Sequence, residues 1–327
     1  MKKLTILVIG MGLVLLNQKT GFSYFGEGVG ARALGMGGTF VAVAEGIDSC
    51  FWNPAGLGNI KKSELTIMRT MNNREITTYH EWLAAGTKLG DYGGIGVNYV
   101  QFKAGFKWYE KETDDLTHYA IDDEWVGLAF GGYGTGQFQN VAMGVNIRKR
   151  TSSLLVGTSA DDFKWSDCPP TGHTTDVIEY DVGILYHVNK EFSLGLIVQN
   201  LDEPVIHYGE DSPIYDFSWK KIIKPGFAYR PDDKTIFAID IYDWTLDNVY
   251  DTKIDMGQSG VRVGFEKWYE DKLAIRAGLL NKYYHTIGFG VRGELKKFFP
   301  ELKYDIDYAL LQGGGAGTHF LSCTVKF

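Results

Sequence analysis

Apolar and polar positions alternate along most of the chain after residue 63. Between Ile178 and Val188 an apolar residue stands at every second position, with acidic, small or polar residues at most positions between them. Successive side chains of a β-strand point to opposite faces, so this period predicts strands with one apolar face. Fourteen such segments follow one another. The predicted strands are 63–72, 80–90, 93–103, 122–133, 138–150, 174–188, 191–201, 217–230, 234–246, 254–268, 271–281, 283–296, 302–312 and 316–327.

The lengths of the strands and of their connections indicate a barrel that crosses a membrane. Most segments reach the roughly 9–11 residues that a tilted strand needs to span a bilayer. Connections after even-numbered strands are short, as at 90–92 and 188–190. The long polar connections, which follow odd-numbered strands, are 104–121, 151–173 and 202–216. Outer-membrane barrels have short turns at one end and long loops at the other, and an even strand count places both chain ends at the short-turn end.

We therefore predict an all-β fold, an antiparallel transmembrane β-barrel of about 14 strands over residues 63–327. A soluble sandwich or propeller is the alternative, in which the polar faces of the strands would meet bulk water. Strand length, aromatic content and loop asymmetry favour the barrel, whose polar strand positions would line the lumen. The predicted lumen-facing residues are Glu179, Asp181, His187, Asp240, Arg262, Glu266, Arg276, Arg292, Asp305 and Asp307.

Composition agrees with a chain built from strands. The 327 residues include 41 Gly, 8 Trp, 19 Tyr and 19 Phe. Aromatic residues favour strands, and Gly disfavours the interior of helices. An apolar share of 44% excludes a largely disordered chain. The net charge of −7 argues against nucleic-acid binding, which needs a basic surface.

The first 23 residues predict a cleaved signal peptide. A basic start precedes an apolar run at 4–16, and Gly21-Phe22-Ser23 has the small-x-small spacing of a cleavage site. A membrane-spanning helix is the alternative, but it would need about 20 apolar residues. The predicted localisation is therefore the outer membrane of a Gram-negative bacterium, after removal of residues 1–23.

No catalytic, metal or cofactor site stands out in the sequence. Cys50, Cys168 and Cys323 are widely spaced and match neither a zinc site nor a disulfide framework, although a Cys50–Cys323 bridge is an open alternative. The seven histidines are scattered, and there is no Gly-x-Ser-x-Gly context for a nucleophile. We therefore expect neither an enzyme nor a bound cofactor or metal, and interpret His187 as a lumen residue rather than a general base.

Residues 24–62 do not alternate and form a separate segment. They are rich in small residues and contain an Asn-Pro turn. Asn tolerates left-handed backbone, and Pro holds the residue before it out of the helical region, so a compact irregular plug inside the barrel is expected. Gly28, Gly30 and Ala33 mimic a dinucleotide-binding fingerprint, but no strand precedes them and this interpretation is rejected. The predicted plug residues are Gly30, Arg32, Gly35, Gly37, Gly38, Asn53, Pro54 and Ala55.

Two runs of this segment resemble a known family. The glycine-rich run 30–38 and the motif Trp52-Asn53-Pro54-Ala55-Gly56-Leu57 resemble the start of the FadL superfamily of outer-membrane proteins, and look closest to its PorV/PorQ-type branch. The resemblance implies an N-terminal hatch that plugs a fourteen-stranded barrel. It also implies that the Asn-Pro-Ala of the motif belongs to the hatch, and that Arg32 is tied to lumen carboxylates.

The resemblance leaves two roles open. FadL-type members pass hydrophobic small molecules by diffusion and then sideways through a gap in the wall, whereas PorV-type members receive and shuttle secreted cargo proteins. We expect the conduit role, with the cargo-protein role as the alternative, and outer-membrane lipids around the barrel in both. The Gly-rich stretch 131–136 is a candidate gap, although a turn is the preferred interpretation. The terminal Phe327 looks like the signal read by the barrel assembly machinery.

Overall fold

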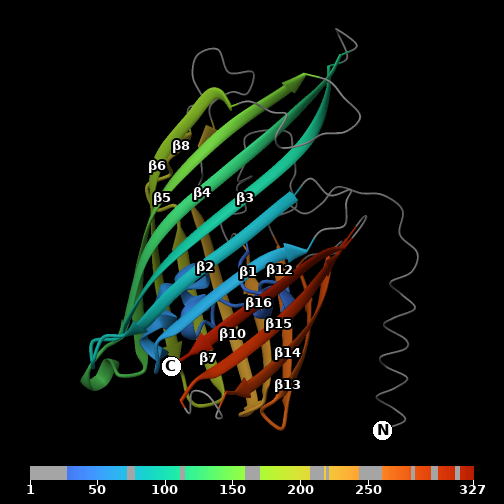
Figure 1. Cartoon of the computed structure of the whole chain (residues 1–327). Coiled ribbons are helices and arrows are strands. Elements are labelled where there is room, and N and C mark those ends of the chain that lie inside the picture. Colours follow the sequence, from blue (N-terminus) through green and yellow to red (C-terminus); the bar gives the residue numbers. More distant parts are fainter. Residues whose placement is uncertain are drawn as a thin grey trace, which may run out of the picture.

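A closed barrel of fourteen antiparallel strands forms the body of the computed structural model (Figure 1). The structure describes residues 28–71, 78–110, 115–158, 170–206, 217–218, 221–242, 260–280, 284–295, 301–313 and 317–327. The barrel strands are β1 (Glu64–Met71), β2 (Thr78–Lys88), β3 (Gly94–Glu110), β4 (Asp115–Tyr133), β5 (Val141–Thr158), β6 (Pro170–His187), β7 (Phe192–Gln199), β10 (Ile222–Asp232), β11 (Thr235–Ile241), β12 (Val261–Tyr269), β13 (Leu273–Leu279), β14 (His285–Glu294), β15 (Lys303–Gln312) and β16 (Thr318–Lys326). β1 pairs with β16 and closes the barrel, while β8 (Val205–Ile206) and β9 (Phe217–Ser218) form a separate two-stranded sheet.

Each of the fourteen predicted segments overlaps one barrel strand, so the predicted fold class is confirmed. The turns after β2, β6, β10 and β12 are short, and the C-terminus lies at the same end of the barrel, called the turn end below (Figure 1). There the backbone N–H of Phe327 donates to the carbonyl of Ser63 at 3.0 Å, and the N–H of Ser63 donates to the carbonyl of Phe327 at 3.1 Å. The connection 134–140 also lies here, so the Gly-rich stretch 131–136 ends a strand and begins a turn rather than opening the wall.

Two of the three predicted long loops are wrong. β3 and β4 run through most of 104–121 as a paired hairpin, and β5 and β6 extend into both ends of 151–173. The third predicted loop, 202–216, contains β8 in its described part. β3 to β6 consequently rise above the other strands at the end opposite the turn end, called the far end below (Figure 1).

Polar pairs between neighbouring strands explain why the alternation of apolar and polar positions ends before the strands do. On the outer face Gln101 of β3 donates to Glu124 of β4 at 2.7 Å, and Lys103 donates to Asp122 at 2.6 Å. Opposite charges and hydrogen-bonding side chains across two strands stabilise a sheet that has no apolar face. A search for apolar residues at every second position therefore stops where the outer face turns polar.

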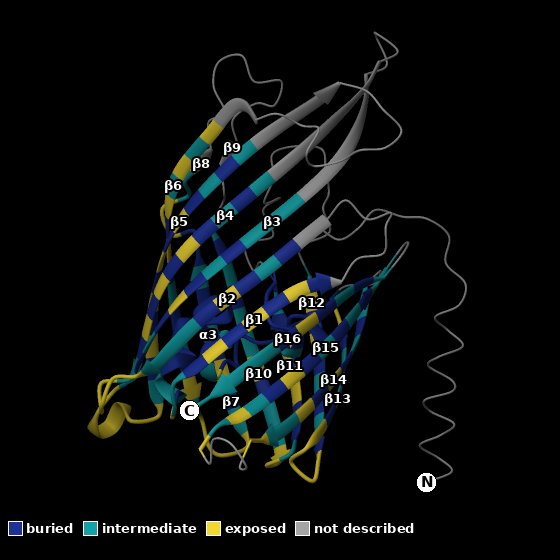
Figure 2. Cartoon of the chain, in the orientation of Figure 1, coloured by how far each residue is buried: buried dark blue, intermediate teal, exposed yellow. Residues whose placement is uncertain are grey.

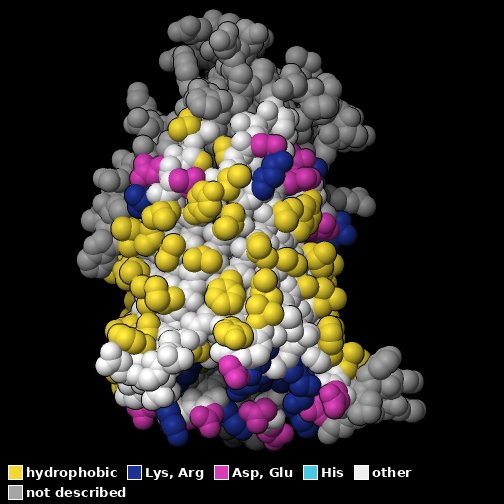
Figure 3. Space-filling view, turned by 90° about the vertical axis from the view of Figure 1, so that its left-hand side faces the viewer, with side chains coloured by type: hydrophobic (Ala, Val, Ile, Leu, Met, Phe, Trp, Pro, Cys, Tyr) yellow, Lys and Arg dark blue, Asp and Glu magenta, His cyan; other side chains and the backbone are white. Residues whose placement is uncertain are grey.

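The outward-facing side chains form an apolar band around the barrel. Exposed and buried residues alternate along the strands in Figure 2, and Ile67, Val126 and Met143 on the outside are 57%, 59% and 58% exposed. On the face drawn in Figure 3, hydrophobic side chains fill the middle, while Lys, Arg, Asp and Glu gather above and below it. A continuous apolar surface of this kind is typical of contact with lipid. Within the described ranges, no helix is long and apolar enough to cross a membrane.

Residues 28–62 fold inside the barrel, toward the turn end, and are called the plug (Figure 1). The plug contains α2 (Ala31–Gly35), η1 (Gly46–Asp48), α3 (Ser49–Trp52) and η2 (Pro54–Asn59). Asn53 begins η2, since its backbone is extended and its side-chain oxygen accepts from the N–H of Ala55 at 3.2 Å. Pro54 fits the first helical position, where no N–H is required. The predicted leader 1–23 and residues 24–27 lie outside the described residues.

A belt of glycines on the inner wall makes room for the plug. Ten of the fourteen strands carry an inward-facing glycine at which an added Cβ would come within 3.0 Å of a plug atom. The glycine belt consists of Gly86, Gly96, Gly131, Gly144, Gly183, Gly195, Gly226, Gly264, Gly278 and Gly288. Several of them stand opposite one another, as Gly144 does with Gly131 and with Gly183. The plug therefore lies directly against the wall backbone around most of the barrel.

Candidate functional site: the plug and the lumen wall

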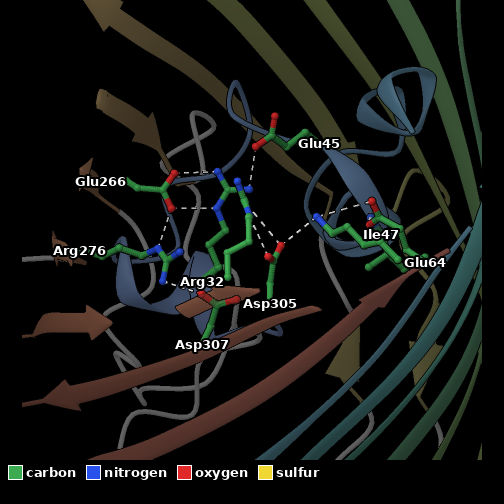
Figure 4. A network of polar contacts seen from close by, with 10 residues as sticks. Arg32, Glu45, Ile47, Glu64, Glu266, Arg276, Asp305 and Asp307 are labelled. Atoms are coloured by element: carbon green, nitrogen blue, oxygen red, sulfur yellow. Dashed lines mark hydrogen bonds and ion pairs between the residues drawn. The ribbon is translucent and has the colours of Figure 1, made fainter. Parts of the chain in front are cut away.

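Arg32 ties the plug to the wall (Figure 4). Its Nε and Nη2 donate to the two carboxylate oxygens of Glu266 on β12 at 2.9 and 2.7 Å, and Nη1 donates to Glu45 of the plug at 2.7 Å. Glu266 also accepts from Arg276 of β13 at 2.6 Å, and Arg276 lies 2.8 Å from Asp307 of β15. A bidentate Arg–carboxylate pair fixes both distance and orientation. The link between Arg32 and a lumen carboxylate that the resemblance implies is present here through Glu266.

A second chain of contacts joins the plug to the strands that close the barrel (Figure 4). Arg292 of β14 donates to Asp305 of β15 at 2.8 Å, and Asp305 lies 2.9 Å from Lys326 of β16. Lys326 lies 3.7 Å from Glu64 of β1, whose carboxylate accepts from the backbone N–H of Ile47 in the plug at 2.9 Å. The chain crosses the β1–β16 seam. Such a chain adds less stability than its short distances suggest, because its buried carboxylates have lost part of their hydration.

Polar side chains hold the plug backbone elsewhere around the wall. Asp240 of β11 accepts from the N–H groups of Phe40 and Val41 at 2.7 and 3.0 Å. Asn53 donates to the carbonyl of Val41 at 2.9 Å and to the carbonyl of Ile184 on β6 at 3.1 Å. Together with the two charge networks, these contacts anchor the plug on both sides of the barrel.

Two acidic residues of the plug retain access to solvent inside the barrel. The Glu45 side chain is 48% exposed, and Asp48 is partly exposed. Burial opposes ionisation of Glu45, but the adjacent Arg32 guanidinium prevails and lowers the pKa of this carboxyl. At Asp48 burial prevails over Arg32 and raises the pKa to about 7, and the neighbouring Asp307 and Glu64 carboxylates add to this shift.

The inner wall carries a charged arc on β5, β6, β10, β11 and β12, with only β7 between β6 and β10. The charged arc consists of Arg148, Arg150, Glu179, Asp181, Lys224, Asp240 and Arg262, all of which are buried. Glu179 lies 3.1 Å from Arg148 and 2.7 Å from Arg150, and Arg148 lies 3.0 Å from Asp181. The charges on β5 and β6 are thus compensated within the wall.

An apolar arc lies on β15, β16 and β1 to β4, with one further residue directly after β13. The apolar arc consists of Met68, Trp82, Val100, Trp125, Leu280, Leu311 and Phe320, all buried in one cluster with plug residues such as Trp52. On strands that carry a belt glycine, these residues stand nearer the far end than the glycine does, as Trp82 does relative to Gly86. One side of the inner wall therefore contributes apolar side chains to the core around the plug.

His187 belongs to a chain of hydrogen bonds near the turn end. Its Nε2 lies 2.6 Å from the hydroxyl of Tyr133, and its Nδ1 lies 2.9 Å from the hydroxyl of Ser193. Tyr133 donates to Asn59 of the plug at 2.9 Å, and Arg230 donates to Ser193 at 3.0 Å. Because Ser193 is buried and accepts from a guanidinium, the arrangement links wall and plug and offers no accessible nucleophile.

The other predicted residues take the following positions. Gly35 and Gly37 lie against wall glycines, and Gly30 and Gly38 have positive φ angles of 78° and 66°. Phe327 is 58% exposed at the turn end. The predicted lumen residues all face the interior, where their hydrogen bonds, ion pairs or ring contacts lie.

Several inward-facing residues are not among the predicted lumen residues. Arg148 and Arg150 stand at alternate positions of a predicted strand, a signal that was available. The apolar arc carries no such signal, because Trp82 faces inward and its neighbour Leu83 faces outward, and both are apolar. Cys50 and Cys323 are free, so the Cys50–Cys323 bridge is absent, and Cys168 lies outside the described residues. Across the described ranges, no cluster of three metal-ligating side chains occurs.

Comparison with known proteins identifies the fold. No protein-family model and no curated protein sequence matches the chain. The structure is similar to that of the Pseudomonas putida toluene transporter TodX, with 13% identity and a TM-score of 0.57 over 94% of this chain and 98% of that chain. It is also similar to the CymD monoaromatic hydrocarbon channel (13%, 0.59, 93% and 99%) and to a Pseudomonas aeruginosa FadL homologue (11%, 0.55, 94% and 99%). The chain has the fold of FadL-type barrels along nearly its whole length.

Proposed function

We propose that the chain is an outer-membrane barrel through which hydrophobic small molecules diffuse across the outer membrane. The apolar arc carries this proposal, because it places buried apolar side chains on one side of the barrel interior. The apolar band on the outside suits the surrounding lipid. The relatives TodX and CymD are a toluene transporter and a monoaromatic hydrocarbon channel, which supports the same class of cargo.

We place the exit for this cargo in the wall between β10 and β11, since the plug fills the lumen toward the turn end. β10 and β11 are paired without interruption only from Gly226 to Tyr229 of β10. Toward the far end, the last paired residues are Gly226 and Asp240. The residue before Gly226 is Pro225, which has no N–H to donate to a neighbouring strand. A sideways exit is also what the resemblance to FadL-type members implies.

We also propose roles for the leader, for the last residue and for the Asn-Pro-Ala motif. The leader 1–23 directs export, the barrel assembly machinery reads the end at Phe327, and the motif 52–57 relates the chain to the PorV/PorQ-type branch. The cargo-protein alternative gains no support, because it depended on large outer loops at 104–121 and 151–173, and much of both stretches is strand.

Liposome uptake tests the conduit role. The refolded barrel is reconstituted with a fluorescent fatty-acid sensor inside the liposomes, and uptake is expected to exceed that of empty liposomes. The Asn53→Ala variant loses the hydrogen bonds to the Val41 and Ile184 carbonyls, so it is expected to leak a small polar dye as well. Asn189→Ala, in the exposed turn after β6, is the matched control, because the Asn189 side chain bonds only within its own turn. A folded barrel that takes up no more fatty acid than empty liposomes would exclude the conduit role.

A further inference from the structure

The outer face of six adjacent strands, β1 to β6, changes from apolar to polar within one outward position on each strand. On β1 the change runs from Ile67 to Arg69, and on β5 it runs from Ile147 to Lys149. A row of directly paired polar residues crosses the six strands, from Arg69 on β1 to Asp176 on β6. With the neighbouring outward residues this row forms the polar collar, which consists of Arg69, Glu81, Gln101, Lys103, Asp122, Glu124, Lys149, Thr151 and Asp176.

The polar collar lies on one side of the barrel. On β7, β11, β12 and β13 the last outward residue toward the far end is apolar, and these residues are Val198, Ile241, Val261 and Leu279. β3 to β6 instead continue past the collar and rise above the other strands (Figure 1). On the face drawn in Figure 3, acidic and basic side chains gather directly above the hydrophobic middle. The collar is therefore continuous with the apolar band below it.

The depth of the collar matches that of lipid headgroups. Two residues along a strand span about 7 Å, so the collar begins no farther than this beyond the last apolar side chains of the band. The headgroup layer on each side of a bilayer is about 5–8 Å thick. The collar side chains therefore meet headgroups, whereas the apolar band meets acyl chains.

Two lysines of the collar keep donors for a partner outside the chain. The Lys103 ammonium lies 2.6 Å from Asp122, and the Lys149 ammonium lies 2.8 Å from Asp176. An ammonium has three N–H donors, and among the described residues each of these two contacts one carboxylate. The Lys149 side chain is 60% exposed. Phosphate oxygens are acceptors that bind such charged donors strongly.

We propose that the polar collar binds the phosphorylated headgroups of lipids in the leaflet at the far end. Its lysines contact phosphate oxygens, and its carboxylates contact the divalent cations that accompany the phosphates. The collar has four carboxylates against three basic side chains, so phosphate without such cations would meet a small excess of negative charge. This inference goes beyond the conduit function and does not depend on it, because it concerns the outside of the wall.

Thermal unfolding of the full chain in zwitterionic detergent micelles tests the lipid. Diphosphorylated lipid A with Mg²⁺ is expected to raise the midpoint as its concentration rises, because a ligand that binds only the folded chain stabilises it. Monophosphorylated lipid A with Mg²⁺ is expected to raise the midpoint less, and a chelator of Mg²⁺ to reverse most of the rise. Equal midpoints with the two lipids would overturn the proposal. An equal rise with Mg²⁺ and inorganic phosphate would overturn the assignment to a lipid.

Lysine variants assign the effect to the collar. Lys103→Gln/Lys149→Gln is expected to weaken binding of diphosphorylated lipid A at least about fivefold, since one lysine near an anionic lipid surface contributes about that factor. Lys234→Gln/Lys267→Gln is the matched control, because both of these lysines are ion-paired with an aspartate at the turn end. A collar variant that binds as tightly as the control would overturn the proposal.

Two further measurements keep the outcomes separate. The heat-dependent shift in gel mobility establishes that each variant has formed a barrel, and the lipid comparison with the unaltered chain decides the question if a variant has not. Fatty-acid uptake by the same variants tests the conduit function alone, and we expect it to be unchanged in the collar variant. Loss of lipid binding with normal uptake is thus distinguishable from failure of the conduit function.

Discussion

We expect Asp48 to make the stability of the folded chain depend on pH. Its folded pKa, about 7, is raised above the value of about 4 for an unfolded chain. A carboxyl with a raised pKa contributes stability that is complete below pH 4 and is lost as the pH rises through 7. Asp48→Asn stays neutral, so we expect it to remove on the order of 1–2 kcal/mol of the difference in stability between pH 5 and pH 8. Midpoints of thermal unfolding in micelles measure this difference.

The control for this prediction is a carboxyl outside the barrel. Asp91 lies exposed in the turn between β2 and β3, so Asp91→Asn should leave the pH dependence as it is. Arg32, Lys326, Glu64 and Asp307 surround Asp48 and are unchanged in both variants. An Asp48→Asn variant whose midpoint falls between pH 5 and pH 8 as steeply as that of the unaltered chain contradicts the prediction.

At the scale of single residues, the sequence predicts which face of the strand a side chain occupies better than which residue that side chain contacts. Charged residues at alternate strand positions are correctly predicted to face the lumen, because a charged side chain that faces lipid destabilises a barrel. The sequence does not reveal that Arg32 meets Glu266, since the two are brought together only when the plug enters the closed barrel. Trp82 and Trp125 are missed because an aromatic residue suits either face of a strand in a membrane barrel.

At the scale of elements, alternation finds every barrel strand but not its length. The tall strands β3 to β6 continue with polar outer faces, as the Lys103–Asp122 pair illustrates, so the period-two signal stops early. A periodic pattern cannot predict the short helices inside the plug, because α3 and η2 are each shorter than two turns of an α-helix. Their positions follow from turn chemistry at Asn53 and from the space left by the glycine belt.

A reversible staple tests whether the β10–β11 seam is the exit. Pro225 and Ile241 are the next pair beyond Gly226 and Asp240, and opposite residues of antiparallel strands lie within reach of a disulfide. In a variant without the native cysteines, oxidation of Pro225→Cys/Ile241→Cys is expected to lower uptake at least several-fold, and a reductant to restore it. The control staple, Val263→Cys/Leu279→Cys, joins paired residues of β12 and β13 and should have no effect. Unchanged uptake with a fully formed seam disulfide would place the exit elsewhere.

At the scale of the whole molecule, wall and plug are built for each other. The glycine belt removes a wall side chain from ten strands where the plug lies, so the plug supplies much of the filling at that level. The same surfaces that let the plug fit would leave an open passage in its absence. Anchors on β1, β6, β11 and β12 hold the plug against this wall.

Deletion of residues 24–62 is therefore expected to convert a closed barrel into an ion-conducting pore. Planar-bilayer recordings should show steady conductance for the deletion variant and nearly none for the full chain, with Arg32→Ala between them because it loses the bonds to Glu266 and Glu45. Circular dichroism and the heat-dependent shift in gel mobility establish that each variant has formed a barrel. A folded deletion variant that conducts no better than the full chain would mean that the wall collapses inward or that other residues close the lumen. Either result would refute the idea that the plug alone seals the barrel toward the turn end.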